Sequence, residues 1–180
     1  VTGSGCVING FRFTGAGQVV SDAQRGEASR IDGFTFIYNK AEGTSLNNTT
    51  SIVRLGTPFR PSSSIAAQQD PTVWAAIERY SNVEISHNFF NGADADNQPA
   101  CVTVCGSGTN LGAAAGTRIQ DNRFVSGGSS INLYNTQGNY DISQNTFLKV
   151  GAGLRKSGSA TGEFCIRLYY VAASKSSGQG

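Results

Sequence analysis

The hydrophobic residues of this chain recur in short groups separated by polar residues and glycines. Between Arg118 and Val150 one pattern, Ile-x-x-Asn-x-Phe, occurs twice at an interval of 23 residues. Its members are Ile119, Asn122, Phe124, Ile142, Asn145 and Phe147. The groups are too short for helices, and residues two positions apart would face the same side of a strand. The pattern therefore predicts short β-strands joined by turns.

Related copies of this pattern can be aligned along most of the chain. Their first residues are Ile8, Ile31, Leu55, Ile85, Ile119, Ile142 and Ile166. A third apolar segment follows seven residues after the Phe, for example Val20 after Phe13. Each repeat of about two dozen residues thus predicts three short strands. The Asn suits a left-handed turn, or side-chain hydrogen bonds between stacked copies.

Three strands per repeat, an Asn at one turn and stacked Ile and Phe rows resemble the right-handed parallel β-helix of the pectate-lyase-like superfamily. The resemblance covers nearly the whole chain. It implies an all-β solenoid of about six to seven coils with three short strands each, in one domain over residues 1–180. Because the sequence begins inside the repeat, we expect a segment of a longer chain. An antiparallel sandwich with coincidental spacing is the alternative.

The superfamily includes polysaccharide lyases, glycoside hydrolases, epimerases, phage tailspikes and non-catalytic proteins, so the fold alone does not define a function. The characteristic motifs of polygalacturonase-like hydrolases, pectate lyases and mannuronan epimerases are absent. A net charge of +2 with only 14% charged residues argues against a nucleic-acid partner. No apolar run reaches the length of a membrane-spanning helix, so no membrane insertion is expected.

The repeat is interrupted by insertions at 60–72, 91–101 and 106–117. These insertions would border a groove over the outer face of one sheet. Strand alternation assigns to that face the expected substrate-binding residues Trp74, Thr103, Asn132, Tyr134 and Arg155. An aromatic ring there would pack against the apolar face of a sugar. Trp74 could equally pack under its own insertion.

Two carboxylates in the second insertion, Asp94 and Asp96, are the candidate catalytic residues. They could act as acid and base on a glycosidic bond, or bind Ca²⁺ for uronate elimination. A solvated turn is the alternative reading of both, and Glu78 and Glu163 are other candidate carboxylates. No other metal or cofactor is expected.

The single histidine, His87, is expected at a turn as a structural residue, which argues against a Ser-His-Asp triad. The equivalent residues of other copies would be Gly33, Asp121 and Gln144. Cys101 and Cys105 bracket one strand at about 13 Å, too far for a disulfide. Cys6 and Cys165 would lie at opposite ends of the stack, so free thiols are expected.

These observations predict a carbohydrate-recognising β-helix at an extracellular or virion surface, most like a phage tailspike or depolymerase acting on cell-surface polysaccharide. A secreted bacterial polysaccharide lyase or glycoside hydrolase is the second hypothesis, with Asp94 or Asp96 catalytic and Arg155 holding the substrate. A non-catalytic structural solenoid or adhesin is the third. A homotrimer is expected only by analogy with tailspikes.

Overall fold

The computed structural model describes ten segments of the chain. These are residues 4–15, 18–21, 30–44, 51–55, 79–92, 100–105, 116–125, 129–134, 140–148 and 165–169. The described segments contain β-strands β1 to β17 and no helix. All strand pairs are parallel, so the predicted all-β class with parallel strands is confirmed.

Three sheets of five strands each, named A, B and C, contain all the described strands except β4 and β8. Sheet A contains β1 (Val7–Asn9), β5 (Thr35–Ile37), β9 (Glu84–Ser86), β12 (Thr117–Gln120) and β15 (Tyr140–Ser143). Sheet B contains β2 (Arg12–Thr14), β6 (Lys40–Thr44), β10 (Phe89–Gly92), β13 (Arg123–Val125) and β16 (Thr146–Leu148). Sheet C contains β3 (Val20–Ser21), β7 (Val53–Leu55), β11 (Ala100–Cys105), β14 (Ser129–Tyr134) and β17 (Ile166–Tyr169). A separate pair joins β4 (Arg30–Asp32) to β8 (Arg79–Ser81).

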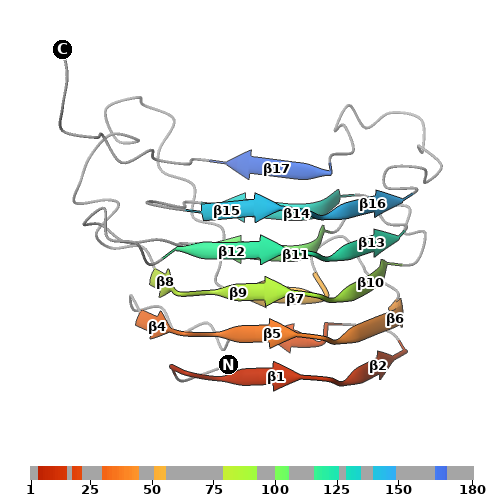
Figure 1. Cartoon of the computed structure of the whole chain (residues 1–180), viewed down its shortest axis with the longest axis horizontal. Coiled ribbons are helices and arrows are strands. Elements are labelled where there is room, and N and C mark those ends of the chain that lie inside the picture. Colours follow the sequence, from red (N-terminus) through yellow and green to blue (C-terminus); the bar gives the residue numbers. More distant parts are fainter. Residues whose placement is uncertain are drawn as a thin grey trace, which may run out of the picture.

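The chain visits sheets A, B and C in turn, and we call each set of three strands a level. The described strands form five levels, from β1, β2 and β3 to β15, β16 and β17. Figure 1 shows them stacked, with β1 and β2 at the bottom and β17 at the top. The arrangement is compatible with a parallel β-helix. The aligned repeat starts had predicted six to seven levels.

The core consists of apolar rows that cross the levels. Sheet A contributes Ile8, Phe36, Ile85, Ile119 and Ile142. Sheet B contributes Phe13, Ala41, Phe90, Phe124 and Phe147. The rings of Phe90 and Phe124 stack at 5.1 Å, and those of Phe124 and Phe147 stack at 5.3 Å. Each buried aromatic side chain stabilises the fold by about 2 kcal/mol.

Level 2, which contains β5, β6 and β7, departs from the regular pattern. Its large aromatic residue lies in sheet A and its small residue lies in sheet B. Ala41 occupies the Phe position of sheet B, and Phe36 occupies the Ile position of sheet A. The Phe36 ring lies 6.1 Å from the rings of both Phe13 and Phe90, so it fills the space that Ala41 leaves. Packing conserves the core volume while the sequence pattern changes.

This exchange explains why the predicted phase of the repeat is wrong in the first half of the chain. Ile31 does not stack on Ile8; it lies in β4 and pairs with Tyr80 of β8. Leu55 lies in β7 of sheet C, and Ile166 lies in β17 of the same sheet, so neither begins a repeat. The copies at Ile8, Ile85, Ile119 and Ile142 are placed as predicted, because these four residues share one row of sheet A.

The turn between sheets A and B carries two adjacent columns of residues. The first, which we call the outer column, has a positive φ at every position: Gly10, Tyr38, His87, Asp121 and Gln144, with φ from 53° to 77°. The second, which we call the asparagine ladder, follows one residue later and consists of Asn39, Asn88, Asn122 and Asn145. The left-handed conformation and the side-chain hydrogen bonds, the two roles considered for the Asn, are therefore both present. They fall on neighbouring residues, the first in the outer column and the second in the asparagine ladder.

The asparagine ladder is a continuous chain of hydrogen bonds. The Nδ2 group of Asn122 donates to the Ile85 carbonyl at 2.8 Å and to Asn145 Oδ1 at 3.0 Å. Its Oδ1 accepts from the backbone and side-chain amides of Asn88, each at 3.0 Å. Asn88 repeats the arrangement one level lower with Asn39. The buried turn thus has its backbone groups satisfied by side chains.

Candidate functional site

The predicted site begins with Thr103 and Asn132 on the outer face of sheet C. They are paired neighbours on β11 and β14, as strand alternation predicted. Their exposed fractions, however, are only 6% and 8%. The outer face of sheet C is therefore covered at these two positions, and the expected open groove floor is not found there.

In sheet C, the observed neighbours of Thr103 and Asn132 also differ from two that the sequence predicted. Arg54 of β7 pairs with Thr103 at the position expected for Trp74. Arg167 of β17 pairs with Asn132 at the position expected for Arg155. Trp74, Asp94, Asp96 and Arg155 lie outside the described residues. Of Tyr134 only the backbone is described, in register with Cys105 and Tyr169.

Buried polar groups line this covered face. The hydroxyls of Thr103 and Ser51 hydrogen-bond at 2.7 Å. Ser130 Oγ and Asn132 Oδ1, two positions apart on β14, are buried and have no hydrogen-bond partner among the described residues. A buried polar group without a partner costs about 1–3 kcal/mol. The unpaired atoms of Ser130 and Asn132 could bind a small polar molecule. A polymer would find no open surface at Thr103 and Asn132, because both are buried.

The described cysteines form no disulfide, and the buried Cys101 thiol is unreactive. Cys6, Cys101 and Cys165 are free, as predicted. Burial raises the pKa of the Cys101 thiol to about 12, so the thiol stays protonated at neutral pH. Within the described ranges, no group of three or more His, Cys, Asp or Glu side chains could hold a metal ion.

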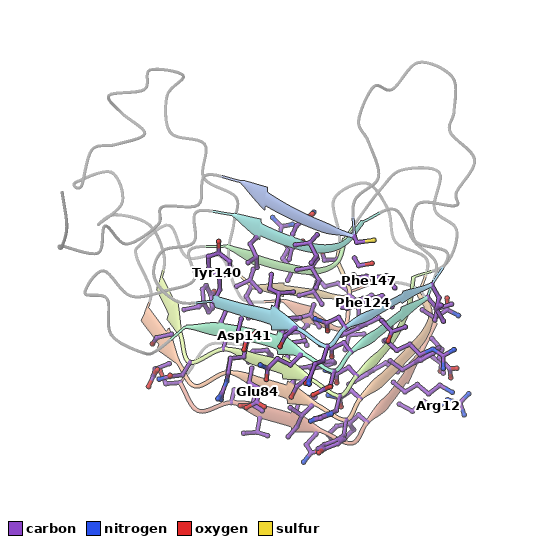
Figure 2. The ribbon with its side chains drawn as sticks, turned by 45° about the horizontal axis from the view of Figure 1, so that its top comes forward. Arg12, Glu84, Phe124, Tyr140, Asp141 and Phe147 are labelled. Carbon is purple, nitrogen blue, oxygen red and sulfur yellow. The ribbon has the colours of Figure 1, made fainter. Side chains whose placement is uncertain are left out.

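The outer face of sheet A carries a charged row that the sequence reasoning missed. Its residues Glu84, Arg118 and Asp141 lie in register on β9, β12 and β15. Arg118 Nη2 lies 3.3 Å from Glu84 Oε2, and Gln120 Nε2 donates to Asp141 Oδ2 at 2.6 Å. Figure 2 labels Glu84 and Asp141 along this sheet. Each charged residue directly precedes Ile85, Ile119 or Ile142, a signal that the sequence contained.

The outer column forms an exposed ridge beside this row. The Tyr38 and His87 rings stack at 4.8 Å with 6° between their planes. His87 Nδ1 lies 3.9 Å from Asp121 Oδ2. His87 is a left-handed turn residue aligned with Asp121 and Gln144, as predicted, but its lower neighbour is Tyr38 rather than Gly33. No Ser-His-Asp arrangement is formed by His87 and the other described residues.

The outer face of sheet B carries a row of three cations and one aromatic ring. We call Arg12, Lys40, Phe89 and Arg123 the cation–aromatic row; they are in register on β2, β6, β10 and β13. Lys40 Nζ lies 5.3 Å from the centre of the Phe89 ring, and Arg123 Cζ lies 6.0 Å from it. Figure 2 shows Arg12 pointing away from the stack, whereas Phe124 and Phe147 point between the sheets.

Glu42 partly neutralises the lower end of this row. Its carboxylate lies 2.9 Å from Arg12 Nη2 and 2.7 Å from Lys40 Nζ. The hydrogen bond from Lys40, with the charges of Lys40 and Arg12, holds the pKa of Glu42 below its ordinary value. Arg123 is exposed, and the structure gives it no carboxylate partner among the described residues.

In the described part of the chain, no helix is long and apolar enough to cross a membrane. The chain matches no protein-family model, and comparisons with curated proteins and with solved structures also give no match. The function is therefore inferred from the side chains described above.

Proposed function

We propose that the chain is a right-handed parallel β-helix of the pectate-lyase-like kind whose outer faces recognise a polysaccharide. The expected context is a phage tailspike or depolymerase at an extracellular or virion surface. The observation that supports this proposal best is the cation–aromatic row of sheet B, because three exposed cations and the half-buried Phe89 follow one another on four successive strands. The site differs from the groove on sheet C that the sequence predicted.

The spacing and chemistry of the row suit a linear sugar polymer. Parallel strands lie about 4.7–4.9 Å apart, so the row presents one side chain per strand along a straight line. Lys40 and Arg123 lie over the Phe89 ring from the two neighbouring strands, so sugar C–H groups would contact the part of the ring that they leave uncovered. Lys40 and Arg123 beside it offer donors to hydroxyl or carboxylate oxygens. A polymer lying across the strands would meet these groups in succession.

The proposal is tested by measuring binding to alginate, polygalacturonate, capsular polysaccharide and lipopolysaccharide. We expect one of these polymers to bind, and Phe89→Ala to weaken its binding roughly tenfold through loss of ring contact. Thr146→Ala, at the end of the same register line, is the matched control and should bind like the parent protein. If none of the four polymers binds, the proposal is wrong.

An enzyme is the second candidate function, and the charged row of sheet A favours it. Glu84 and Asp141 lie two strands apart, so their backbones are about 9.5 Å apart, and inverting glycosidases hold their two carboxyl groups about 6.5–9.5 Å apart. Asp94 and Asp96 stay the candidates from the sequence. New reducing ends, or absorbance of unsaturated products, would reveal the activity. Loss of product in Asp141→Asn but not in Asp94→Ala and Asp96→Ala would assign it to sheet A.

A structural solenoid without a ligand is the remaining hypothesis. It predicts that neither polymer binding nor product formation is measurable, with the fold intact by circular dichroism. Light scattering would give the number of chains in the assembly, which tests the homotrimer expected from the tailspike analogy.

A further inference from the structure

The outer column contains an open position beside an exposed aromatic ring. One face of the Tyr38 ring is covered by His87 at 4.8 Å. On its other side the next residue of the column is Gly10, whose N–H donates to the Ile37 carbonyl at 3.1 Å. Gly10 has no side chain to cover Tyr38, and Tyr38 is 60% exposed.

The space that a Gly10 side chain would occupy, which we call the Gly10 slot, is not filled by any of the described residues. A Cβ atom added to Gly10 would meet nothing within 4 Å. The column spacing sets the distance from the slot to Tyr38, since neighbouring levels lie about 4.8 Å apart. A ring held in the slot would therefore stack on Tyr38 at about the distance at which His87 stacks on its other face.

The borders of the slot combine apolar and polar groups. Asn9 precedes Gly10 and is exposed, and Phe11 follows it with an exposed fraction of 57%. The side chain of Arg12, the first residue of the cation–aromatic row, is 69% exposed. A sugar ring matches these borders, because it has an apolar C–H face for the Tyr38 ring and hydroxyl groups for the amide and guanidinium.

We propose that the Gly10 slot binds one pyranose ring of a polysaccharide, which packs its C–H face on the free face of Tyr38. This proposal rests on the polysaccharide-binding function, and it adds a binding position at the lower end of the cation–aromatic row. Gly10 and Arg12 belong to the same level, so one polymer can contact both.

Filling the slot from the protein side tests the proposal. Gly10→Asn places a side chain in the slot, and Asn tolerates the left-handed conformation that Tyr38, His87, Asp121 and Gln144 already adopt. Tyr38→Ala removes the platform, whereas Tyr38→Phe keeps the ring. Gln144→Asn is the matched control, because it makes a similar change in the same column at the other end of the stack.

The polymer that binds best among alginate, polygalacturonate, capsular polysaccharide and lipopolysaccharide serves as the probe. We expect Gly10→Asn and Tyr38→Ala to raise its Kd roughly tenfold, with Tyr38→Phe and Gln144→Asn unchanged. Saturation-transfer NMR should show transfer to sugar ring protons that is lost in Tyr38→Ala. Thermal unfolding would check that each variant is folded.

The outcomes separate this proposal from the general function. If Phe89→Ala weakens binding and Gly10→Asn does not, the slot proposal is wrong and the polysaccharide function stands. If Gly10→Asn and Tyr38→Ala change only the thermal stability, a protein segment rather than a sugar covers Tyr38, and the proposal is also wrong. If the parent protein binds none of the four polymers, both proposals fail.

Discussion

The two columns at the turn between sheets A and B lie one residue apart and follow opposite rules. The asparagine ladder is nearly uniform and faces inward, with Asn88 and Asn122 only 2% and 1% exposed. The outer column is exposed and has a different residue at each level, from Gly10 to Gln144. A buried turn position must satisfy its neighbours' hydrogen bonds, whereas the position beside it must only tolerate a positive φ. Chemical variety, and with it function, is therefore expected in the outer column.

The largest expected effect comes from breaking the ladder. Asn88→Ala removes the acceptor of the Asn39 amides and the donor to the Phe36 carbonyl and to Asn122. We expect a loss of about 3–4 kcal/mol in the free energy of unfolding, because several buried groups lose their partners at once. Urea denaturation would measure this loss.

The neighbouring residue of the outer column gives the control for this prediction. His87→Asn keeps a residue that tolerates the left-handed turn, so we expect a change within about 0.5 kcal/mol. Equal losses from Asn88→Ala and His87→Asn would contradict the distinction between the columns.

The contrast between buried and exposed positions extends to the thiols. Cys101 is fully buried with a pKa of about 12, whereas Cys165 is exposed. Since the thiolate is the reactive form, we expect iodoacetamide at pH 8 to modify Cys101 roughly 100-fold more slowly than Cys165. Mass spectrometry of peptides from the folded protein would measure both rates, and urea should abolish the difference. Equal rates before unfolding would show that Cys101 is accessible.

A smaller change in stability is expected from removing a buried hydroxyl group that lies outside the asparagine ladder. Ser130 Oγ on sheet C has no hydrogen-bond partner in the described part of the chain, so Ser130→Ala should stabilise the fold by about 1 kcal/mol. Ser86 is a matched buried serine whose hydroxyl donates to Glu84 Oε1 at 3.0 Å, and Ser86→Ala should destabilise by a similar amount. Thermal unfolding would compare the two variants. Destabilisation by Ser130→Ala would instead indicate a bound water or ligand at this hydroxyl.

The smallest effect concerns the turn between β4 and β5, where Asp32 lies beside Gly33. Hydrogen bonds from Ser81 Oγ and Asn82 Nδ2 lower the pKa of Asp32 below its ordinary value of about 3.9. The folded pKa is below the unfolded one, so the stabilisation is present above about pH 4 and is lost as the pH falls through the folded pKa. Asp32→Asn should therefore have a lower Tm than the parent protein at pH 7, and the two should converge near pH 2. A constant difference across this range would contradict the prediction.

The fold could be predicted from the sequence where the repeat keeps its residue types. Ile85, Ile119 and Ile142 gave the correct register, because size and polarity recur at fixed positions. The phase failed at level 2, where Phe36 and Ala41 replace Ile and Phe. The pattern Phe36-x-x-Asn39-x-Ala41 was nevertheless readable, since the ladder requires Asn while the core requires only a constant volume.

The candidate site was less predictable, for two physical reasons. Alternation along β11 and β14 correctly brought Thr103 and Asn132 together, but whether an outer face is covered depends on segments distant in sequence. The Tyr38–His87 stack did not follow from the predicted phase, which aligned Gly33 rather than Tyr38 with His87. The row of Glu84, Arg118 and Asp141 was readable, because each of these residues directly precedes an isoleucine of the repeat.

The exchange of large and small side chains at level 2 has a consequence for how this protein can change. The aromatic ring between Phe13 and Phe90 is supplied by Phe36 of sheet A, although the regular pattern would take it from sheet B at Ala41. The two positions are thus coupled: each constrains the other across the corner, and neither can be altered independently. Related chains are expected to vary at these positions as a pair, with the ring passing from one strand to the other while the stack stays filled.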